Sequence, residues 1–289
     1  MATVYEILTE KFIDLMTYCR DNDIPWTKPF TVGGRQTSVS TGNNYRGVNQ
    51  VLLGFSAFRN EFGENRWGTY KGWQKLDGQV RKGEKSTVAM FYKSTIYKAE
   101  NSDGETEERQ GRILRYFRLF NADQVDGIER VSTADRVDLT ERLEQADKFL
   151  GGCGAEIKLT DSQPCYHPTQ DYINLATRET YKDTPTSTAT ECFYSTWAHE
   201  LTHWTGHETR LARPLNNKFT SKEYAYEELI AELGAAFLCC KLEISNEPRA
   251  DNAAYCNSWL SRMENDPKIM LRASSAASKA VDFLEATEE

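Results

Sequence analysis

Two histidines separated by three residues are the first feature of this sequence that could do chemistry. His199 and His203 bracket Glu200 in the stretch His-Glu-Leu-Thr-His, an H-E-x-x-H pattern. Because positions i and i+4 of a helix share a face, both imidazoles could bind one metal ion. Glu200 would then lie near the open side of the ion and could take a proton from bound water. The alternative is an ordinary helix with two hydrogen-bonded histidines.

A catalytic zinc site needs a third protein ligand, and two acids are candidates. Glu228 follows His203 by 25 residues, and Glu232 lies one helical turn further on. The E-x-x-A-E spacing resembles a segment of gluzincin metallopeptidases, in which the first acid binds metal and the second orients a ligating histidine. That resemblance implies Glu228 as the ligand and Glu232 as its outer-shell support. The reverse assignment stays open, because both acids share a side; Glu227 lies off that face and is expected to be solvated.

The two remaining histidines are not expected to bind the ion. His207 stands four residues beyond His203, but Gly206 should end the helix, so a capping or outer-shell role is expected for His207. Metzincins place a third histidine ten residues after the first, where this chain has Thr209. His167 is expected on the surface or in the cleft. The ligand set suits zinc, with Mn²⁺ or another divalent ion as alternatives.

A second group of residues could bind nucleic acid, because single strands are held by positive grooves with aromatic rings on which bases stack. Residues 24–98 carry twelve Lys and Arg against four acids, whereas residues 99–289 carry 21 against 34. The chain as a whole has a net charge of −8. The predicted DNA-binding residues are Trp26, Tyr45, Arg46, Asn49, Arg66, Trp67, Tyr70, Lys71, Trp73, Arg81, Lys82 and Lys85. A place in the core is the alternative for Trp26 and Trp73.

The elements that must position these residues indicate an α+β fold with two domains. The periodicity predicts helices over 3–20, 138–152 and around the two metal-site segments. Strands are predicted over 86–99 and 112–125, joined by an acidic hairpin tip, and over 155–161 and 171–176. The strand at 171–176 is expected at a sheet edge beside the cleft. A small N-terminal α/β domain that binds single-stranded DNA should span 1–130, and a C-terminal zincin-like metallopeptidase domain 138–289.

The composition also bears on the compartment. The seven cysteines are odd in number and form no C-x-x-C pair, which favours reduced thiols in a cytoplasmic protein. No run of eighteen apolar residues occurs, so we expect no membrane partner.

Several longer motifs resemble one known family. The stretches IPWTKPF, NNYRGVN, VRKGEKS and RYFRLFNADQVDGI look like the N-terminal single-stranded-DNA-binding domain of the ArdC antirestriction family. WAHELTHWTGHETRL and YAYEELIAELGAAFL look like the zincin-type metallopeptidase domain that follows it in that family. The resemblance implies a protein of a plasmid or other mobile element that binds single-stranded DNA and counters host restriction.

Three functional hypotheses follow. In the first, the protein binds single-stranded DNA and protects incoming DNA, alone or through contact with a host restriction-modification component. In the second, it is a DNA-tethered zinc metallopeptidase that cleaves a host protein such as a restriction subunit or a repressor. The third, a metal-dependent nuclease, is disfavoured because two-metal nucleases use clustered carboxylates.

Overall fold

The computed structural model of the chain describes residues 3–31, 34–100, 106–130, 139–215, 221–246 and 252–287. The tip of the expected hairpin and the expected domain boundary lie partly outside these ranges. The α-helices of the described residues are α1 (Val4–Asp21), α2 (Lys28–Thr31), α3 (Val48–Arg59), α4 (Tyr70–Gln74), α5 (Leu139–Gly152), α6 (Ala189–Trp204), α7 (Lys222–Leu242), α8 (Asn252–Asn265) and α9 (Ile269–Ala286).

The N-terminal half is built on a mostly antiparallel sheet of four strands, in the order β1-β2-β5-β4. The two short strands, β1 (Thr37–Ser38) and β2 (Arg66–Gly68), pair in parallel, and β2 pairs antiparallel with β5 (Thr106–Asn121). The strand β4 (Thr87–Glu100) then pairs with β5 along its whole length. A separate pair is formed by β3 (Gln79–Val80) and β6 (Val125–Asp126), the latter preceded by the 3-10 helix η1 (Ala122–Gln124).

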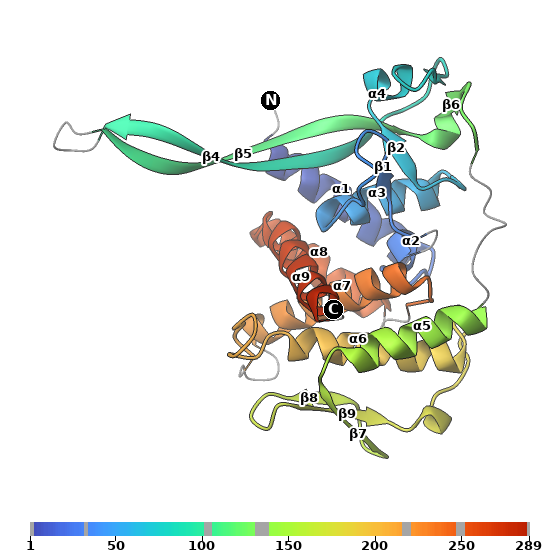
Figure 1. Ribbon diagram of the computed structural model, residues 1–289, viewed down its shortest axis with the longest axis vertical. Coiled ribbons are helices and arrows are strands. Elements are labelled where there is room, and N and C mark those ends of the chain that lie inside the picture. Colours follow the sequence, from blue (N-terminus) through green and yellow to red (C-terminus); the bar gives the residue numbers. More distant parts are fainter. Residues whose placement is uncertain are drawn as a thin grey trace.

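The paired strands β4 and β5 form a long twisted ribbon that extends away from the body of the protein (Figure 1). Only the end of β5 nearest the body, at Phe120 and Asn121, also pairs with β2. The two strands were predicted, and the structure shows that the pairing continues into the acidic tract, to Glu100 opposite Thr106.

The C-terminal half contains a three-stranded sheet in the order β7-β9-β8, which lies beside α5 and α6 (Figure 1). Its strands are β7 (Glu156–Thr160), β8 (Cys165–His167) and β9 (Tyr172–Ala176), and the 3-10 helix η3 (Arg178–Thr180) follows. The prediction that residues 171–176 form an edge strand is wrong, because β9 is central. It pairs with β7 on one edge and with β8 on the other.

One continuous hydrophobic core joins the two halves of the chain. It takes buried side chains from α1, α2 and α3 and from α5 through α9. The ring of Phe30 lies 6.3 Å from that of Phe237, centroid to centroid, at 62°. Nearby, the amide of Asn246 donates to the Thr27 hydroxyl at 2.7 Å. The N-terminal half therefore rests directly on the helices that carry the candidate metal site.

The first helix follows its prediction closely. A capping box between Thr3 and Glu6 begins α1, and its apolar side chains Leu8, Phe12, Leu15 and Met16 are buried. All seven cysteines lie in the described ranges and are free thiols. In the described part of the chain, no helix is both long and apolar enough to cross a membrane.

Candidate functional site

Two packed helices, α6 and α7, hold all the candidate metal-binding side chains. A capping box between Thr188 and Glu191 begins α6 and leads to the histidines one turn apart near its end. Close packing against α7 depends on Gly234: a Cβ at this position would lie 2.4 Å from Cγ2 of Thr202. The absence of a side chain there lets the acids of α7 reach the imidazoles of α6.

The structure brings His199, His203 and Glu228 into one group with converging donor atoms. The two Nε2 atoms are 3.2 Å apart, and each lies 3.5 Å from a carboxylate oxygen of Glu228. Donors bound about 2.0–2.2 Å from a tetrahedral ion lie roughly 3.3–3.6 Å apart. The two imidazole nitrogens therefore have the spacing of two corners of such a tetrahedron, and each lies at a similar spacing from a different oxygen of Glu228.

The other ring nitrogens of the two histidines face carboxylates. Nδ1 of His203 hydrogen-bonds to Glu227 at 3.2 Å, and Nδ1 of His199 lies 3.7 Å from Glu232. A carboxylate at Nδ1 holds the proton there and leaves Nε2 to bind metal. Glu232 thus lies where an outer-shell support is needed. The expectation that Glu227 is solvated is wrong: it is 6% exposed, because the start of α7 lies over the end of α6.

Glu227 is also held by an arginine that returns from the segment after α6. Arg213 donates to both carboxylate oxygens of Glu227, at 2.8 and 3.0 Å, and to the backbone carbonyl of Thr202 at 2.6 Å. Gly206 makes room for this side chain, since a Cβ there would lie 2.9 Å from the guanidinium. Sequence reasoning missed this Arg213–Glu227–His203 arrangement, although the adjacent acids Glu227 and Glu228 were visible.

The electrostatics of the site favour a cation. Burial alone would lower the pKa of His203, but hydrogen bonds and attraction from Glu227 and Glu228 outweigh burial and raise that pKa to about 10. For Glu228, burial alone would raise the pKa, yet the contacts of its carboxylate with His199 and His203 hold that pKa well below the usual range. Because ligands must be deprotonated, a metal ion competes with the His203 proton.

The remaining predicted residues of this region have different surroundings. Glu200 is 2% exposed and lies between the two histidines in sequence. The side chain of Glu228 is 29% exposed, so the donor group opens to solvent on that side. His207 lies beyond the end of α6, bonds to the Thr209 hydroxyl at 2.8 Å and is outside the donor group. His167 is half-buried on β8 and stacks on Tyr172.

The three predicted tryptophan platforms lie in the core instead. Trp26, Trp67 and Trp73 are 1%, 0% and 1% exposed. The indole of Trp67 donates to Gln36, and that of Trp73 donates to the backbone carbonyl of Phe120 at 3.0 Å. Stacking of a nucleobase needs an open ring face. The core interpretation therefore replaces the stacking role for these three residues.

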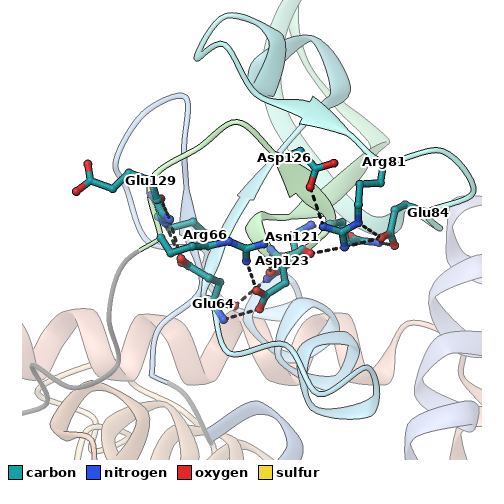
Figure 2. Close-up of polar contacts among 10 residues, drawn as sticks. Glu64, Arg66, Arg81, Glu84, Asn121, Asp123, Asp126 and Glu129 are labelled. Carbon is teal, nitrogen blue, oxygen red and sulfur yellow. Dashed lines mark hydrogen bonds and ion pairs between the residues drawn. The ribbon is translucent and has the colours of Figure 1, made fainter.

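Two predicted arginines are tied into ion pairs at the base of the ribbon, as Figure 2 shows. Arg66 forms two parallel hydrogen bonds to the carboxylate of Glu64, at 2.7 and 2.9 Å. Arg81 contacts Glu84 at 2.7 Å and Asp126 at 3.4 Å. Both guanidinium groups thus hold local structure together, and their charge is largely balanced by these acids.

Three predicted residues of the NNYRGVN stretch have local partners. Tyr45 is half-buried, and Arg46 is exposed but paired with Asp282 of α9. Asn49 exchanges two hydrogen bonds with the backbone of Met90, at 2.6 and 2.8 Å, and so caps the open edge of β4. Asn49 acts here as an edge-covering residue.

The other four predicted DNA-binding residues are on the surface. Tyr70 is 43% exposed, and Lys71, Lys82 and Lys85 are exposed. Tyr70, Arg81 and Lys82 line one open hollow with Phe120. Sequence reasoning missed further exposed aromatic side chains on the ribbon, at Phe91, Tyr116 and Phe117. A signal was present: the segments around them contain many cations and no acid.

Comparison with known proteins finds a match to a known domain in each half of the chain. Residues 2–121 match the N-terminal domain of anti-restriction factor ArdC, and residues 144–276 match a zincin-like metallopeptidase domain. A crystal structure of metal-free ArdC from plasmid R388 superimposes with a TM-score of 0.77 at 32% identity, over 99% of this chain and 98% of that one. This chain belongs to the ArdC antirestriction family. The match confirms both the family resemblance and the two-part α+β fold.

Other proteins are also similar to this chain over almost its whole length. Protein y4eC of Sinorhizobium fredii is 31% identical over 99% of this chain and 92% of its own length. The Escherichia coli DNA primase TraC is 30% identical over 99% of this chain, which spans 20% of the primase. The Mn(II)-bound R388 ArdC structure superimposes with a TM-score of 0.75 at 30% identity, over 99% and 98% of the two chains. A zincin-like fold with these donors implies a site for a divalent metal ion.

Proposed function

We propose that this ArdC-family protein binds single-stranded DNA entering a bacterial host, protects that DNA from host restriction, and holds a divalent ion at His199, His203 and Glu228. The observation that carries the proposal is the match of residues 2–121 to the N-terminal domain of anti-restriction factor ArdC, in the same chain as a preassembled donor group. Protection would follow from covering the DNA, or from contact with a host restriction-modification component brought close by it.

The N-terminal surface supports this proposal through a few exposed side chains. Tyr70 offers a ring beside Lys82, and Lys71 and Lys85 add positive charge on neighbouring segments. Aromatic rings between cations suit the bases and phosphates of a single strand. We therefore keep these four residues as DNA contacts.

The metal centre favours a second candidate function, a DNA-tethered metallopeptidase that cleaves a host protein such as a restriction subunit or repressor. A purely structural site has no need of an acid between its histidines, whereas peptide hydrolysis needs a base there. A bound zinc ion would polarise a carbonyl and lower the pKa of water. Glu200 would hold the proton, while Glu227 and Glu232 keep the imidazoles oriented.

The identity of the ion is part of the proposal. Two imidazoles and a carboxylate suit zinc, and the Mn(II)-bound R388 ArdC structure makes manganese the main alternative. Metal analysis of protein purified without added ions, followed by competition between Zn²⁺ and Mn²⁺, distinguishes the two. Retention of neither ion by protein with intact His199 and His203 would contradict the metal assignment.

DNA binding is tested by titrating the purified protein with single- and double-stranded oligonucleotides across a salt series, with and without a chelator. We expect preferential, salt-sensitive binding of single strands that persists after metal removal, since none of the predicted DNA contacts belongs to the donor group. Equal affinity for duplex and single strands would contradict the proposed DNA function and would not affect the proposed metal site.

Glu200→Gln separates the two candidate functions. The variant should keep metal and DNA binding, because the side-chain volume is conserved, and should lose any peptidase activity. His199→Ala serves as the contrast, since it should also lose the metal. Protection of transferred DNA in a restricting host is then compared. Protection that survives Glu200→Gln shows that peptidase chemistry is not required, and protection lost with DNA binding intact favours the enzyme.

A further inference from the structure

The β4/β5 ribbon has an unusual composition for a chain with an excess of acids. Residues 87–99 and 109–120 contain six Lys or Arg, six aromatic residues and no Asp or Glu. The acids of the hairpin are confined to residues 100–108 at its far end. A basic, aromatic ribbon on a protein of net charge −8 points to a polyanionic partner.

Several aromatic and basic side chains of this ribbon are exposed in the part next to the body. Phe91, Tyr116 and Phe117 are 41%, 41% and 45% exposed, and Arg115 and Arg118 are exposed between them. Rings of this size are normally buried, so a cluster of exposed ones indicates a binding surface. The rings of Phe91 and Phe117 meet edge-on, with centroids 5.6 Å apart.

The strand register shows how rings and cations are arranged. Phe91 pairs with Arg115 and Ala89 pairs with Phe117, so Phe91, Phe117 and Arg115 share one face. Tyr116 and Arg118 lie on the opposite face of β5, where alternate positions repeat about every 6.7 Å. Arg115 and Phe117 therefore adjoin Phe91 on one face, and Tyr116, Arg118 and Phe120 alternate along the other face of β5.

This second face continues onto the body of the protein. Phe120 follows Arg118 by two residues on the same strand, and its ring lies 6.5 Å from that of Tyr70. Phe120 and Tyr70 line the hollow that also contains Lys82. A linear ligand could therefore pass from the ribbon to the exposed residues of the N-terminal surface without a break.

We propose that the β4/β5 ribbon is the arm around which single-stranded DNA wraps, with Arg115 and the rings of Phe91 and Phe117 contacting it on one face and Arg118 and the ring of Tyr116 on the other; the arginines would bind phosphates and the rings would stack on bases. The proposal rests on the proposed single-strand binding and assigns it to residues. Charge complementarity favours nucleic acid over a protein partner. The open ring faces favour single strands, since bases in a duplex are already stacked.

Two pairs of variants test the arm in the full-length protein with a fluorescent oligonucleotide. Phe117→Ala should weaken single-strand binding about 5- to 100-fold, the range expected for one lost stacking contact. Leu159→Ala, at an exposed apolar residue of β7, is its control and should change nothing. Arg115→Ala with Arg118→Ala should make the slope of log K against log salt shallower by about 1.4. The exposed lysines of the other half, Lys148→Ala with Lys182→Ala, form the charge-matched control.

The outcomes separate this proposal from the one on which it rests. If the unaltered protein does not bind single strands, the proposed DNA function is ruled out altogether. If the unaltered protein and the ribbon variants bind single strands equally well, the ribbon is ruled out as the DNA-binding arm, but the proposed DNA function is not. Variants that bind DNA normally but change the oligomeric state in light scattering would show that the ribbon meets a second copy instead.

Photo-crosslinking gives a readout that needs no variant. An oligonucleotide carrying 5-iodouracil is irradiated with the unaltered protein, and the crosslinked peptides are identified by mass spectrometry. We expect crosslinks at Phe91, Tyr116 or Phe117. Crosslinks confined to peptides of residues 139–287 would overturn the proposal.

Discussion

The metal centre and the N-terminal surface differ in how their side chains are positioned. At the metal centre, two adjacent helices supply all three candidate donors, and buried partners such as Glu227 and Arg213 hold the histidines in place. On the N-terminal surface, short strands, loops and a protruding ribbon carry the exposed side chains, and several cations already have acidic partners. In a helix, the periodicity of the backbone determines which side chains share a face, whereas in a loop the direction of each side chain depends on the surrounding packing.

This difference explains why the spacing of residues predicted the position of their side chains better than the local composition did. The H-E-x-x-H spacing specifies a geometry, because residues i and i+4 of any helix are neighbours. A tryptophan beside a lysine specifies none, since either can point inward. Trp26, Trp67 and Trp73, which were predicted to stack on bases, are buried, while Phe91 and Phe117, which were not predicted to bind DNA, are exposed.

The largest effect that would test this contrast is expected from Trp67→Ala. The side chain is fully buried beside Leu53, Ala57 and Leu119, so its removal should cost about 3–5 kcal/mol of folding free energy. Denaturant unfolding measures this loss. The exposed Tyr70→Ala is the control and should change stability by less than about 0.5 kcal/mol while weakening DNA binding. A stable Trp67→Ala protein that had lost DNA binding would restore the stacking interpretation.

A smaller effect is expected from Glu227→Gln at the metal centre. The amide keeps the shape but removes the charge that orients His203 and pairs with Arg213, so metal affinity should fall about 10- to 100-fold. Competition with a chromogenic chelator measures the affinity. Glu223→Gln, at an exposed position on the same helix, should leave it unchanged. Equal affinities for the two variants would show that Glu227 does not support the ligand.

The smallest effect is expected from single charges at the N-terminal surface. Lys82→Ala should make the salt dependence of single-strand binding shallower by about 0.7, the contribution of one phosphate contact. Arg81→Ala should change the slope less, because Arg81 already contacts Glu84 and Asp126. Charge reversal at both positions should weaken binding further. Identical salt slopes for Lys82→Ala and the unaltered protein would move the DNA path away from this hollow.

The fold was predictable where local patterns carry it. The apolar spacing of α1 and the β-branched and aromatic run of β4 were visible in the sequence. The short strand β8 was missed, and with it the central place of β9, because a three-residue strand has no periodicity of its own. The partners of Glu227 were equally invisible, since Arg213 reaches it only after the chain turns back past Gly206.

The sequence by itself determined the family, the two-part organisation and the pair of histidines, because each depends on order and spacing along the chain. Only the tertiary structure decided which acid faces which ring nitrogen, which aromatic residues stay in solvent, and that one hydrophobic core joins the two halves. These features depend on distances between residues far apart in the chain, and such distances arise only when the helices and strands pack together.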